Sequence, residues 1–368
     1  MSNRVRSVLP MLLLGGLLGP GVAAAQYGYG GGGMGGGGMM PVAPTPPAHP
    51  ATVTNLVEDQ AGAAQTDPHL VDAWGLVAGP ATPWWVNNAT TNTSTLYGGT
   101  GTVLPLVVSV PGQPTGIVFN GGSQFALASG PALFLFATQA GIVSGWNQSS
   151  GVTAETVANR TSVGAVYTGL AIASTPTGDQ LYAADFHNAR IDVFDGRFNL
   201  VSNPSAFADK KIPKRFAPFN IQNLGGTLFV TYAKQDKAKR FDAPGAGLGF
   251  VDMFDTSGNL LGRVASKGAL DAPWGVAMAP SVFGDVGGDL LVGNFGNGKI
   301  NAYQRKSNGH WKPHGSLRLS SGRPVKIDGL WGLAFGNDGP AGPSTTLYFT
   351  AGPSNGSHGV FGSIAAGG

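Results

Sequence analysis

Aromatic and polar side chains recur at two matching places along this chain, and together they are typical of a ligand-binding pocket. Four aromatic residues stand near the start of a repeated apolar phrase: Trp74, Phe219, Trp274 and Trp331. Six polar residues follow stretches with strand character: Asn88, Asp185, His187, Lys234, Asp236 and Asn294. Rings that bury apolar ligand surface, beside a few polar groups that fix orientation, are the usual composition of a small-molecule site. These ten residues are the candidate ligand-binding set.

Metal-assisted chemistry is the alternative use of the same residues. Asn88, Asp185 and Asn294 carry oxygen atoms of the kind that coordinates Ca²⁺. A calcium-dependent hydrolase or lactonase would need Asp185 or His187 as its general base. The only two glutamates, Glu58 and Glu155, are expected after a closing strand and in an outer strand, away from a central site. We predict no cofactor, keep Ca²⁺ as the alternative, and identify no complete catalytic set.

Two further motifs are expected to be chance matches. Residues 352–356 read Gly-Pro-Ser-Asn-Gly and fit the Gly-x-Ser-x-Gly pattern of serine hydrolases. That pattern needs a strand-to-helix turn, and we expect a hairpin loop with no helix after it. The glycine-rich run 245–249 precedes a strand and lacks the lysine of a phosphate-binding loop. The insertion 236–247 is either a lid over a channel or a solvent loop.

A repeated unit must position these residues. Six copies of the phrase, clearest as Trp-Gly-aliphatic-Ala, occupy residues 73–78, 114–119, 167–172, 218–223, 273–278 and 330–335. A period of about fifty residues predicts a radial repeat of small antiparallel sheets. The sequence therefore predicts an all-β fold, a six-bladed β-propeller. The starts of first strands and the ends of second strands share one face of such a disc, so the ten candidates would surround one mouth of the central channel.

Blade five shows the pattern most clearly. Its expected strands are residues 274–280, 289–295, 299–303 and 316–319, with a Gly-Asn-Gly hairpin before the third. No segment carries a sustained helical period, so no helix is expected in the domain. The sixth blade ends near residue 363 without room for a fourth strand. Residues 51–57 are expected to supply that strand, so that the N-terminal segment joins the C-terminal blade and closes the ring.

The first fifty residues differ in composition from the rest. Residues 1–25 have a basic start, a leucine-rich stretch and a small-residue end, which predicts a secretory signal peptide. Residues 26–50 are rich in glycine and then in proline, which indicates a disordered linker. The propeller is expected over residues 51–364, with a tail at 365–368. The protein is thus expected to be exported, to the periplasm, the medium or the cell surface, with no transmembrane segment once the signal is removed.

Charge and cysteine content exclude several classes of function. The chain has 22 basic and 19 acidic side chains, and two of the basic ones, Arg4 and Arg6, lie in the expected signal. A nearly neutral balance gives no support to nucleic-acid binding. No cysteine is present, which excludes thiol nucleophiles, thiolate metal sites and disulfides. We expect a monomer whose partner is a protein, a glycan or a small ligand.

Several passages resemble known propeller families. Residues 181–186 (Leu-Tyr-Ala-Ala-Asp-Phe) and 190–195 (Arg-Ile-Asp-Val-Phe-Asp) are similar to NHL-type repeats. Longer strings, at 66–71, 217–226, 230–236, 288–296 and 327–336, resemble an uncharacterised bacterial family of secreted proteins. The resemblance implies a six-bladed propeller and export, and it carries no activity. The favoured hypothesis is a binding or interaction module that is not an enzyme.

Overall fold

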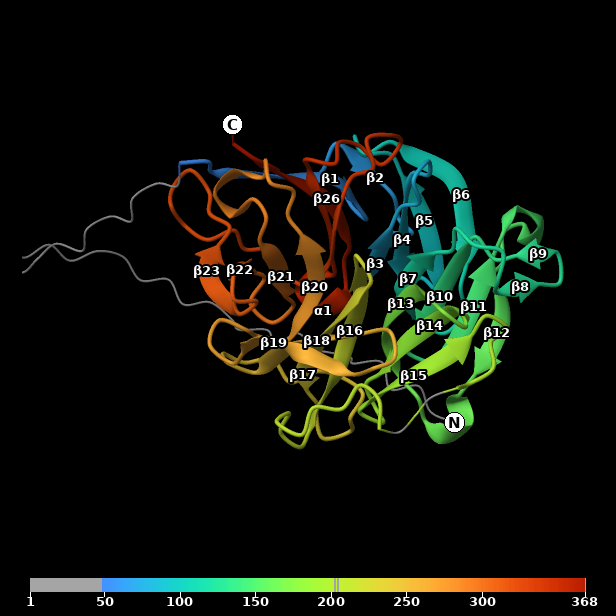
Figure 1. Ribbon diagram of the computed structural model, residues 1–368. Helices are drawn as coiled ribbons and strands as arrows, with labels where there is room; N and C mark the ends of the chain where they lie inside the picture. The colour runs from blue at the N-terminus through green and yellow to red at the C-terminus, as the bar shows by residue number, and fades with distance from the viewer. Residues whose placement is uncertain (1–47, 202, 204, 368) are drawn as a thin grey trace, which may run out of the picture. The chain divides into compact units, whose positions relative to one another are not determined.

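A computed structural model describes residues 48–201, 203 and 205–367. The expected signal peptide and most of the expected linker lie outside these residues. Within them, the chain forms small antiparallel sheets arranged around a common axis (Figure 1). The six-bladed β-propeller predicted from the repeated phrase is confirmed.

The first three blades follow one another along the chain. Blade one contains β3 (Ala73–Val77), β4 (Trp84–Asn88), β5 (Thr93–Tyr97) and β6 (Val103–Ser109). Blade two contains β7 (Pro114–Phe119), β10 (Phe134–Thr138), β11 (Ile142–Trp146) and β12 (Glu155–Asn159), with a small hairpin of β8 (Ala126–Leu127) and β9 (Gly130–Pro131). Blade three contains β13 (Tyr167–Thr175), β14 (Gly178–Asp185) and β15 (Arg190–Asp195).

The remaining blades repeat the same order of strands. Blade four contains β16 (Phe216–Leu224), β17 (Thr227–Lys234), β18 (Gly249–Phe254) and β19 (Leu260–Ser266). Blade five contains β20 (Pro273–Met278), β21 (Leu290–Asn294), β22 (Ile300–Arg305) and β23 (Trp311–Ser316). Blade six contains β24 (Leu330–Phe335), β25 (Leu347–Ala351) and β26 (Val360–Ala366).

The ring is closed by the N-terminal strand, as predicted. Strand β1 (Ala51–Glu58) pairs antiparallel with β26, with Val53 opposite Ile364. A short strand β2 (Gln65–Thr66) extends this sheet by pairing parallel to β1. Closure covers the edge of β26, which would otherwise expose unpaired backbone groups to other chains.

The glycine of the repeated phrase is explained by crowding at the axis. The inner strands β3, β7, β13, β16, β20 and β24 contact one another in a closed ring. A Cβ atom on Gly75 would lie 2.2 Å from the carbonyl oxygen of Thr115 in the next blade. A Cβ on Gly275 would lie 2.4 Å from the carbonyl oxygen of Trp331. Only glycine allows neighbouring backbones to approach this closely.

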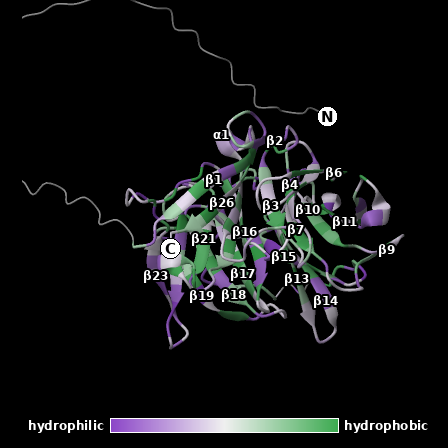
Figure 2. Cartoon of the chain, turned by 90° about the horizontal axis from the view of Figure 1, so that it is seen from above, coloured by the Kyte–Doolittle hydropathy of each residue, from purple (hydrophilic) through white to green (hydrophobic). Residues whose placement is uncertain are grey.

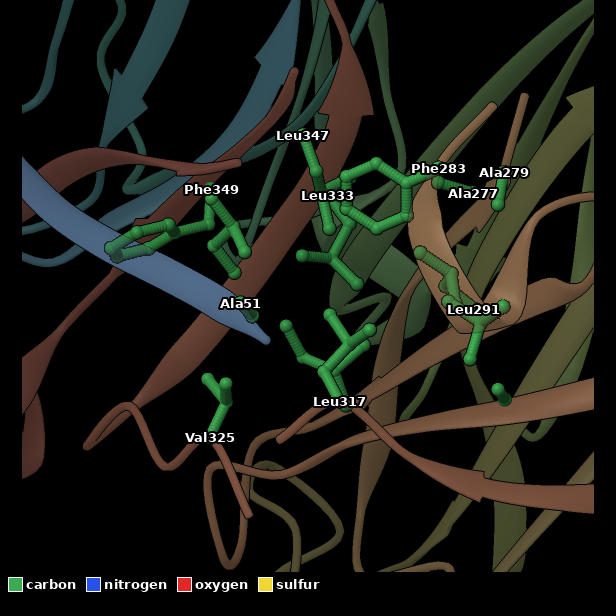
Figure 3. Packing of buried hydrophobic residues seen from close by; sticks show 14 of the residues in the cluster. Ala51, Ala277, Ala279, Phe283, Leu291, Leu317, Val325, Leu333, Leu347 and Phe349 are labelled. Carbon is green, nitrogen blue, oxygen red and sulfur yellow. The ribbon is translucent and has the colours of Figure 1, made fainter. Parts of the chain in front are cut away.

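Apolar cores lie between adjacent blades. Figure 3 shows the cluster between blades five and six, where Leu291, Leu333, Phe349 and Ala51 meet. Ala51 belongs to the closing strand, so ring closure also completes this core. In Figure 2, hydrophobic colouring marks β21, the second strand of blade five, and hydrophilic colouring marks the outer strand β23. No helix among the described residues is long and apolar enough to cross a membrane.

Three details differ from the predictions. The fourth strand of blade five is β23 rather than residues 316–319, because the turn at 306–310 returns the chain earlier than expected. In blade three the described residues form three strands, and the outer edge carries a bridge between Phe194 and Leu200. The expectation of no helix is wrong: three short 3₁₀ turns and α1 (Pro353–Gly356) are present. Single turns of this kind are too short to produce a helical period.

Candidate functional site

The four aromatic candidates meet at the centre of the ring. Trp74 and Trp331 stack with ring centroids 3.6 Å apart, and Trp274 meets both edge-on at 6.1 and 5.8 Å. Phe219 packs against Trp331 at 5.7 Å. All four side chains are buried. They therefore form an aromatic plug across the channel at the starts of the inner strands, instead of lining an open mouth.

Two blades carry threonine where the others carry a ring. Thr115 and Thr168 occupy this position in blades two and three. Trp274 of blade five reaches over to blade three, where its indole nitrogen donates to the Thr168 carbonyl oxygen at 2.9 Å. The Thr115 hydroxyl donates to the carbonyl oxygen of Tyr167 at 2.8 Å. The small residues on one side of the ring leave room for the large rings that come from the other side.

A titratable residue beside the plug was missed from the sequence. Asp72 precedes β3 with a left-handed φ of 54° and accepts a hydrogen bond from the Trp331 indole at 3.3 Å. A Cβ added to Gly352 would lie 2.3 Å from Oδ1 of Asp72, so blade six packs directly on the carboxyl group. Burial raises the pKa of Asp72 to about 6, and the hydrogen bond from the Trp331 indole partly opposes the shift. No single-sequence signal separates Asp72 from an ordinary turn aspartate.

Three polar candidates that end second strands are tied to local partners. The Asn88 amide donates to the hydroxyls of Thr93 and Thr95 in its own blade. The Asn294 amide donates to the carbonyl oxygen of Ala269, in the segment leading into blade five. The Asp185 carboxylate accepts from the backbone of Val166 and from Asn188. These three suggested Ca²⁺ ligands share no partner in the described part of the chain.

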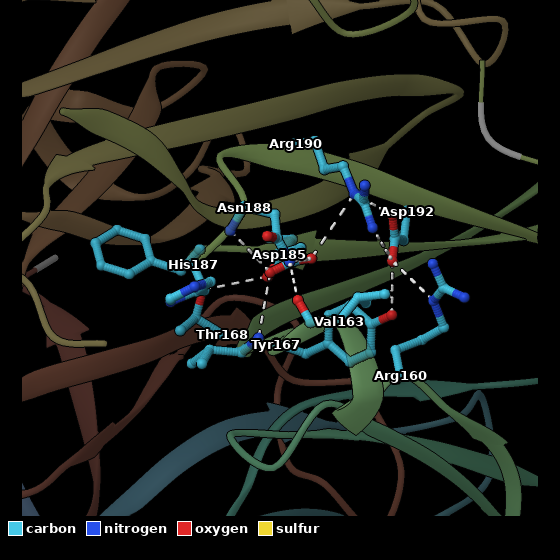
Figure 4. A network of polar contacts seen from close by, with 12 residues as sticks. Arg160, Val163, Tyr167, Thr168, Asp185, His187, Asn188, Arg190 and Asp192 are labelled. Carbon is cyan, nitrogen blue, oxygen red and sulfur yellow. Dashed lines mark hydrogen bonds and ion pairs between the residues drawn. The ribbon is translucent and has the colours of Figure 1, made fainter. Parts of the chain in front are cut away.

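Asp185 belongs to an extended network between blades two and three (Figure 4). Arg190 lies 2.7 Å from Asp192, and the Tyr167 hydroxyl donates to Asp192 at 2.8 Å. Burial raises the pKa of Asp185, and its hydrogen bonds with Asn188 oppose the shift. His187 lies at the edge of this network (Figure 4), and its Nδ1 is buried without a hydrogen-bond partner in the described structure.

The last two candidates lie where β17 ends and the insertion before β18 begins. Lys234 is the final residue of β17, and the Asp236 carboxylate accepts from the backbone N–H of Arg240 at 2.9 Å. Asp242, further along the insertion, has its pKa raised to about 7 by burial, with smaller contributions from Asp271 and Asp236. Asp271 accepts from the backbone of Gly245 at 2.6 Å. The insertion is thus a folded loop held at the junction of blades four and five.

An open cavity lies on the other side of the plug. It has a volume of about 320 Å³ and is lined by the later parts of the inner strands, with Trp274 from the plug. The contributing segments are residues 75–78, 116–119, 170–172, 220–223 and 332–333. Each inner strand lies at one edge of its sheet, so one side of its backbone is not paired within the sheet and faces the axis. Such edges present unpaired N–H and C=O groups to a ligand.

Blade four breaks the symmetry of this cavity. Five blades carry glycine at the crowded position, whereas blade four carries Asn220. The Asn220 amide donates to the carbonyl oxygen of Trp274 at 2.9 Å. Gln222 and Asn223 follow on the same strand and also line the cavity. The polar side chains of the wall are therefore three amides from one inner strand, and no charged residue belongs to the lining.

Comparison with known proteins places the chain in a family whose matched members are uncharacterized proteins. No protein-family profile matches the chain. The chain is 36% identical over 323 residues to the uncharacterized protein R648 of Acanthamoeba polyphaga mimivirus, covering 82% of this chain and 76% of the relative. It belongs to the family of this viral protein. A second member, the uncharacterized protein L690 of the same virus, is 35% identical, with 74% of this chain and 75% of the relative covered.

Solved structures support the fold of the family. A protein of unknown function from Bacteroides thetaiotaomicron superposes with a TM-score of 0.56 at 9% identity, over 86% of this chain and 76% of that one. A streptogramin B lyase superposes with a TM-score of 0.50 at 11% identity, over 86% and 98%. Similarity at this level of identity shows a shared propeller architecture. The NHL-like and bacterial resemblances stay predictions beside the viral relatives.

Proposed function

We propose that this family member is an exported binding protein that holds a small, neutral, hydrogen-bonding ligand in the axial cavity. The observation that carries the proposal is the chemistry of the wall, which combines backbone edges, the Gln222 amide and the ring of Trp274. The amide nitrogens of Asn220 and Asn223 already donate to backbone carbonyl oxygens, so these side chains offer the ligand their amide oxygens. Pockets that orient ligands through a few convergent polar groups are typical binding sites. Their volumes begin at about 300 Å³, so this cavity suits a ligand about the size of a sugar unit.

The same wall favours binding over catalysis. General acid–base or nucleophilic chemistry needs a titratable or nucleophilic side chain within hydrogen-bond reach of the substrate. The residues that line the cavity are aliphatic, aromatic, glycine or amide residues. The buried carboxyl groups of Asp72, Asp185 and Asp271 are not among them. A ligand in the cavity would be held without an acid or base against it.

A neutral carbohydrate fits these groups best. Its hydroxyls both donate and accept hydrogen bonds, which matches strand edges that offer both kinds of group. One face of a sugar ring is apolar and could pack on Trp274 at the base of the cavity. A charged ligand would lose hydration without gaining an opposite charge from the wall.

A ligand-binding titration tests the proposal. Purified protein is titrated calorimetrically with neutral mono- and disaccharides, and the intrinsic tryptophan fluorescence is followed in parallel. Gln222→Trp places a large ring at the half-buried cavity wall and is expected to weaken binding by about tenfold or more. Gln148→Trp, on an exposed turn of blade two, is the matched control and should bind as the parent does. Equal binding by both variants would place the ligand elsewhere.

The calcium-dependent hydrolase remains the competing proposal for this fold. It would require oxygen ligands to converge around one ion, and the three suggested ligands contact different partners. Elemental analysis of the purified protein separates the two functions. A stoichiometric, tightly held divalent ion would favour the enzyme.

A further inference from the structure

A second groove lies away from the axial cavity, beside the closing strand. It has a volume of about 370 Å³ and lies between the end of β1, the segment before β24 and the loop after β25. Its wall includes three side chains of types found together in serine hydrolases: Asp59, Ser354 and His358. None of them takes part in the axial cavity.

His358 and Asp59 form an oriented pair across the ring closure. The Nδ1 atom of His358 lies 2.9 Å from Oδ2 of Asp59, and the Gln60 amide lies 3.2 Å from the same nitrogen. The other Asp59 oxygen accepts from the backbone N–H of Gly359 at 3.0 Å. A carboxylate on Nδ1 fixes the imidazole tautomer and leaves Nε2 as the nitrogen that accepts a proton. His358 is about half-exposed, with 38% of its side chain accessible, so Nε2 can be reached from the groove.

Ser354 occupies a strained turn that follows β25, the second strand of blade six. β25 ends at Ala351, and α1 follows with Ser354 at φ 56°, ψ 45° and Asn355 at φ 58°, ψ 41°. A left-handed backbone is unfavourable for serine and is a feature of functional turns when it is kept. The Asp328 carboxylate accepts from the Ser354 backbone N–H at 3.0 Å and helps to hold the turn. The Gly-x-Ser-x-Gly motif lies in the hairpin loop between β25 and β26, as expected from the sequence, and a single left-handed turn presents Ser354 there.

The serine hydroxyl and the following backbone N–H are both available to contact a substrate. Within the described residues, neither the Ser354 hydroxyl nor the Asn355 N–H makes a hydrogen bond. In Gly-x-Ser-x-Gly hydrolases the N–H after the serine contributes to the oxyanion hole. Catalytic hydrogen bonds are commonly completed only when substrate is bound, which is when Ser354 Oγ would meet His358 Nε2.

We propose that Ser354, His358 and Asp59 form a metal-independent site that hydrolyses small carboxylic esters. His358 Nε2 removes the hydroxyl proton as Ser354 Oγ bonds to the ester carbonyl carbon. The ester C–O bond then breaks, and the alcohol leaves with that proton. The same imidazole then deprotonates water, which attacks the acyl carbon. The bond between that carbon and Oγ breaks, the acid is released, and the His358 imidazolium returns its proton to Oγ. Asp59 acts as a positioning residue for His358. This site is separate from the proposed axial binding function.

Active-site labelling tests the assignment directly. A fluorophosphonate probe forms a phosphorus–oxygen bond with an activated serine and loses fluoride. Intact-mass and peptide mapping should find one adduct, at Ser354. Ser354→Ala should abolish the adduct, and Ser357→Ala, an exposed serine three residues away, should retain it. No adduct on the folded protein, or an adduct that survives Ser354→Ala, would overturn the proposal.

Ester hydrolysis gives the second readout. With 4-nitrophenyl acetate, Ser354→Ala should return the rate to that of buffer, and His358→Gln should lower it roughly 100-fold. Asp59→Asn should lower kcat and alter the pH profile, which a purely structural role would not do if the circular dichroism melt is unchanged. Sugar binding by Ser354→Ala should equal that of the parent. A parent rate no higher than that of Ser354→Ala would refute the assignment and leave the axial-cavity proposal unaffected.

Discussion

The indole nitrogen of Trp274 lies 2.9 Å from the carbonyl oxygen of Thr168, so a side chain of blade five is bonded to the inner strand of blade three. These blades are not neighbours in the ring. The bond therefore ties the propeller together through its centre, in addition to the contacts between adjacent blades. The aromatic plug is a structural element as well as the base of the axial cavity.

Removal of this central bond should lower the stability of the whole propeller. Trp274→Phe keeps an aromatic ring but leaves the buried Thr168 carbonyl without its donor, at a cost of about 1–3 kcal/mol in the free energy of unfolding. Trp274→Ala should cost about 3–5 kcal/mol because a cavity is added. Urea unfolding followed by circular dichroism measures both. Trp311→Phe, on the outer strand of blade five, is the control and should change stability much less.

Glycine at the axis should be intolerant of a single methyl group. In Gly75→Ala the new Cβ would lie 2.2 Å from the Thr115 carbonyl oxygen, so the inner strands of blades one and two must separate. We expect a lower melting temperature and a decrease of at least about 1–3 kcal/mol in the free energy of unfolding, which is the usual cost of overpacking. Gly98→Ala is the matched control, because its nearest neighbour would be an ordinary contact at 3.4 Å. Equal melting temperatures for the two variants would contradict close packing at the axis.

Because of Asp72, the free energy of unfolding should decrease as pH rises from about 4 to about 6. Its pKa of about 6 in the folded protein lies above the ordinary value of 3.8, so the folded state binds more protons than the unfolded state in this window. The parent should lose up to about 3 kcal/mol as pH rises through it. Asp72→Asn, which keeps the shape and an acceptor for Trp331, should match the parent below pH 4 and be more stable above pH 6.

The control for Asp72 is another aspartate with a left-handed backbone. Asp338 has φ 56°, and a hydrogen bond from the Ser344 backbone N–H lowers the pKa of this carboxyl. Its contribution to stability is present above the ordinary pKa and is lost as pH falls through the lowered value. Asp338→Asn should therefore be slightly less stable than the parent at neutral pH, the opposite sign to Asp72→Asn. Denaturant titrations at pH 4, 5, 6 and 7 measure both differences.

Closure by β1 should be essential for a monomeric ring. A chain that starts at residue 60 lacks the strand that covers β26 and completes the core at Ala51. It should aggregate or unfold at a markedly lower temperature, since an unpaired edge is left open. A chain that starts at residue 48 should melt with the parent. Size-exclusion chromatography and thermal unfolding of the two truncations decide the matter, and a stable monomer starting at residue 60 would show that closure is dispensable.

The repeated phrase was sufficient to predict the architecture because each copy occupies the same structural position, the inner strand of a blade. Gly75 and Gly275 stand where inner backbones crowd, and the apolar residues beside them fill the cores between blades. Ring closure followed from the missing fourth strand of blade six. Among the described residues blade three has no fourth strand either, and a count of residues does not reveal this. The chain after β15 is long enough, but its described part pairs with β15 only near Leu200 and Val201.

The site was decided by tertiary structure. The sequence correctly grouped Trp74, Trp274 and Trp331, since equal places in a repeat meet at the axis, but it did not show that they fill the channel. That outcome depends on ring radius and on Thr115 and Thr168 opposite them. The environment of Asp72 and the pairing of His358 with Asp59 could not be predicted from the sequence for a similar reason. Their environments are made by residues about three hundred positions away, brought together only when the first strand joins the last blade.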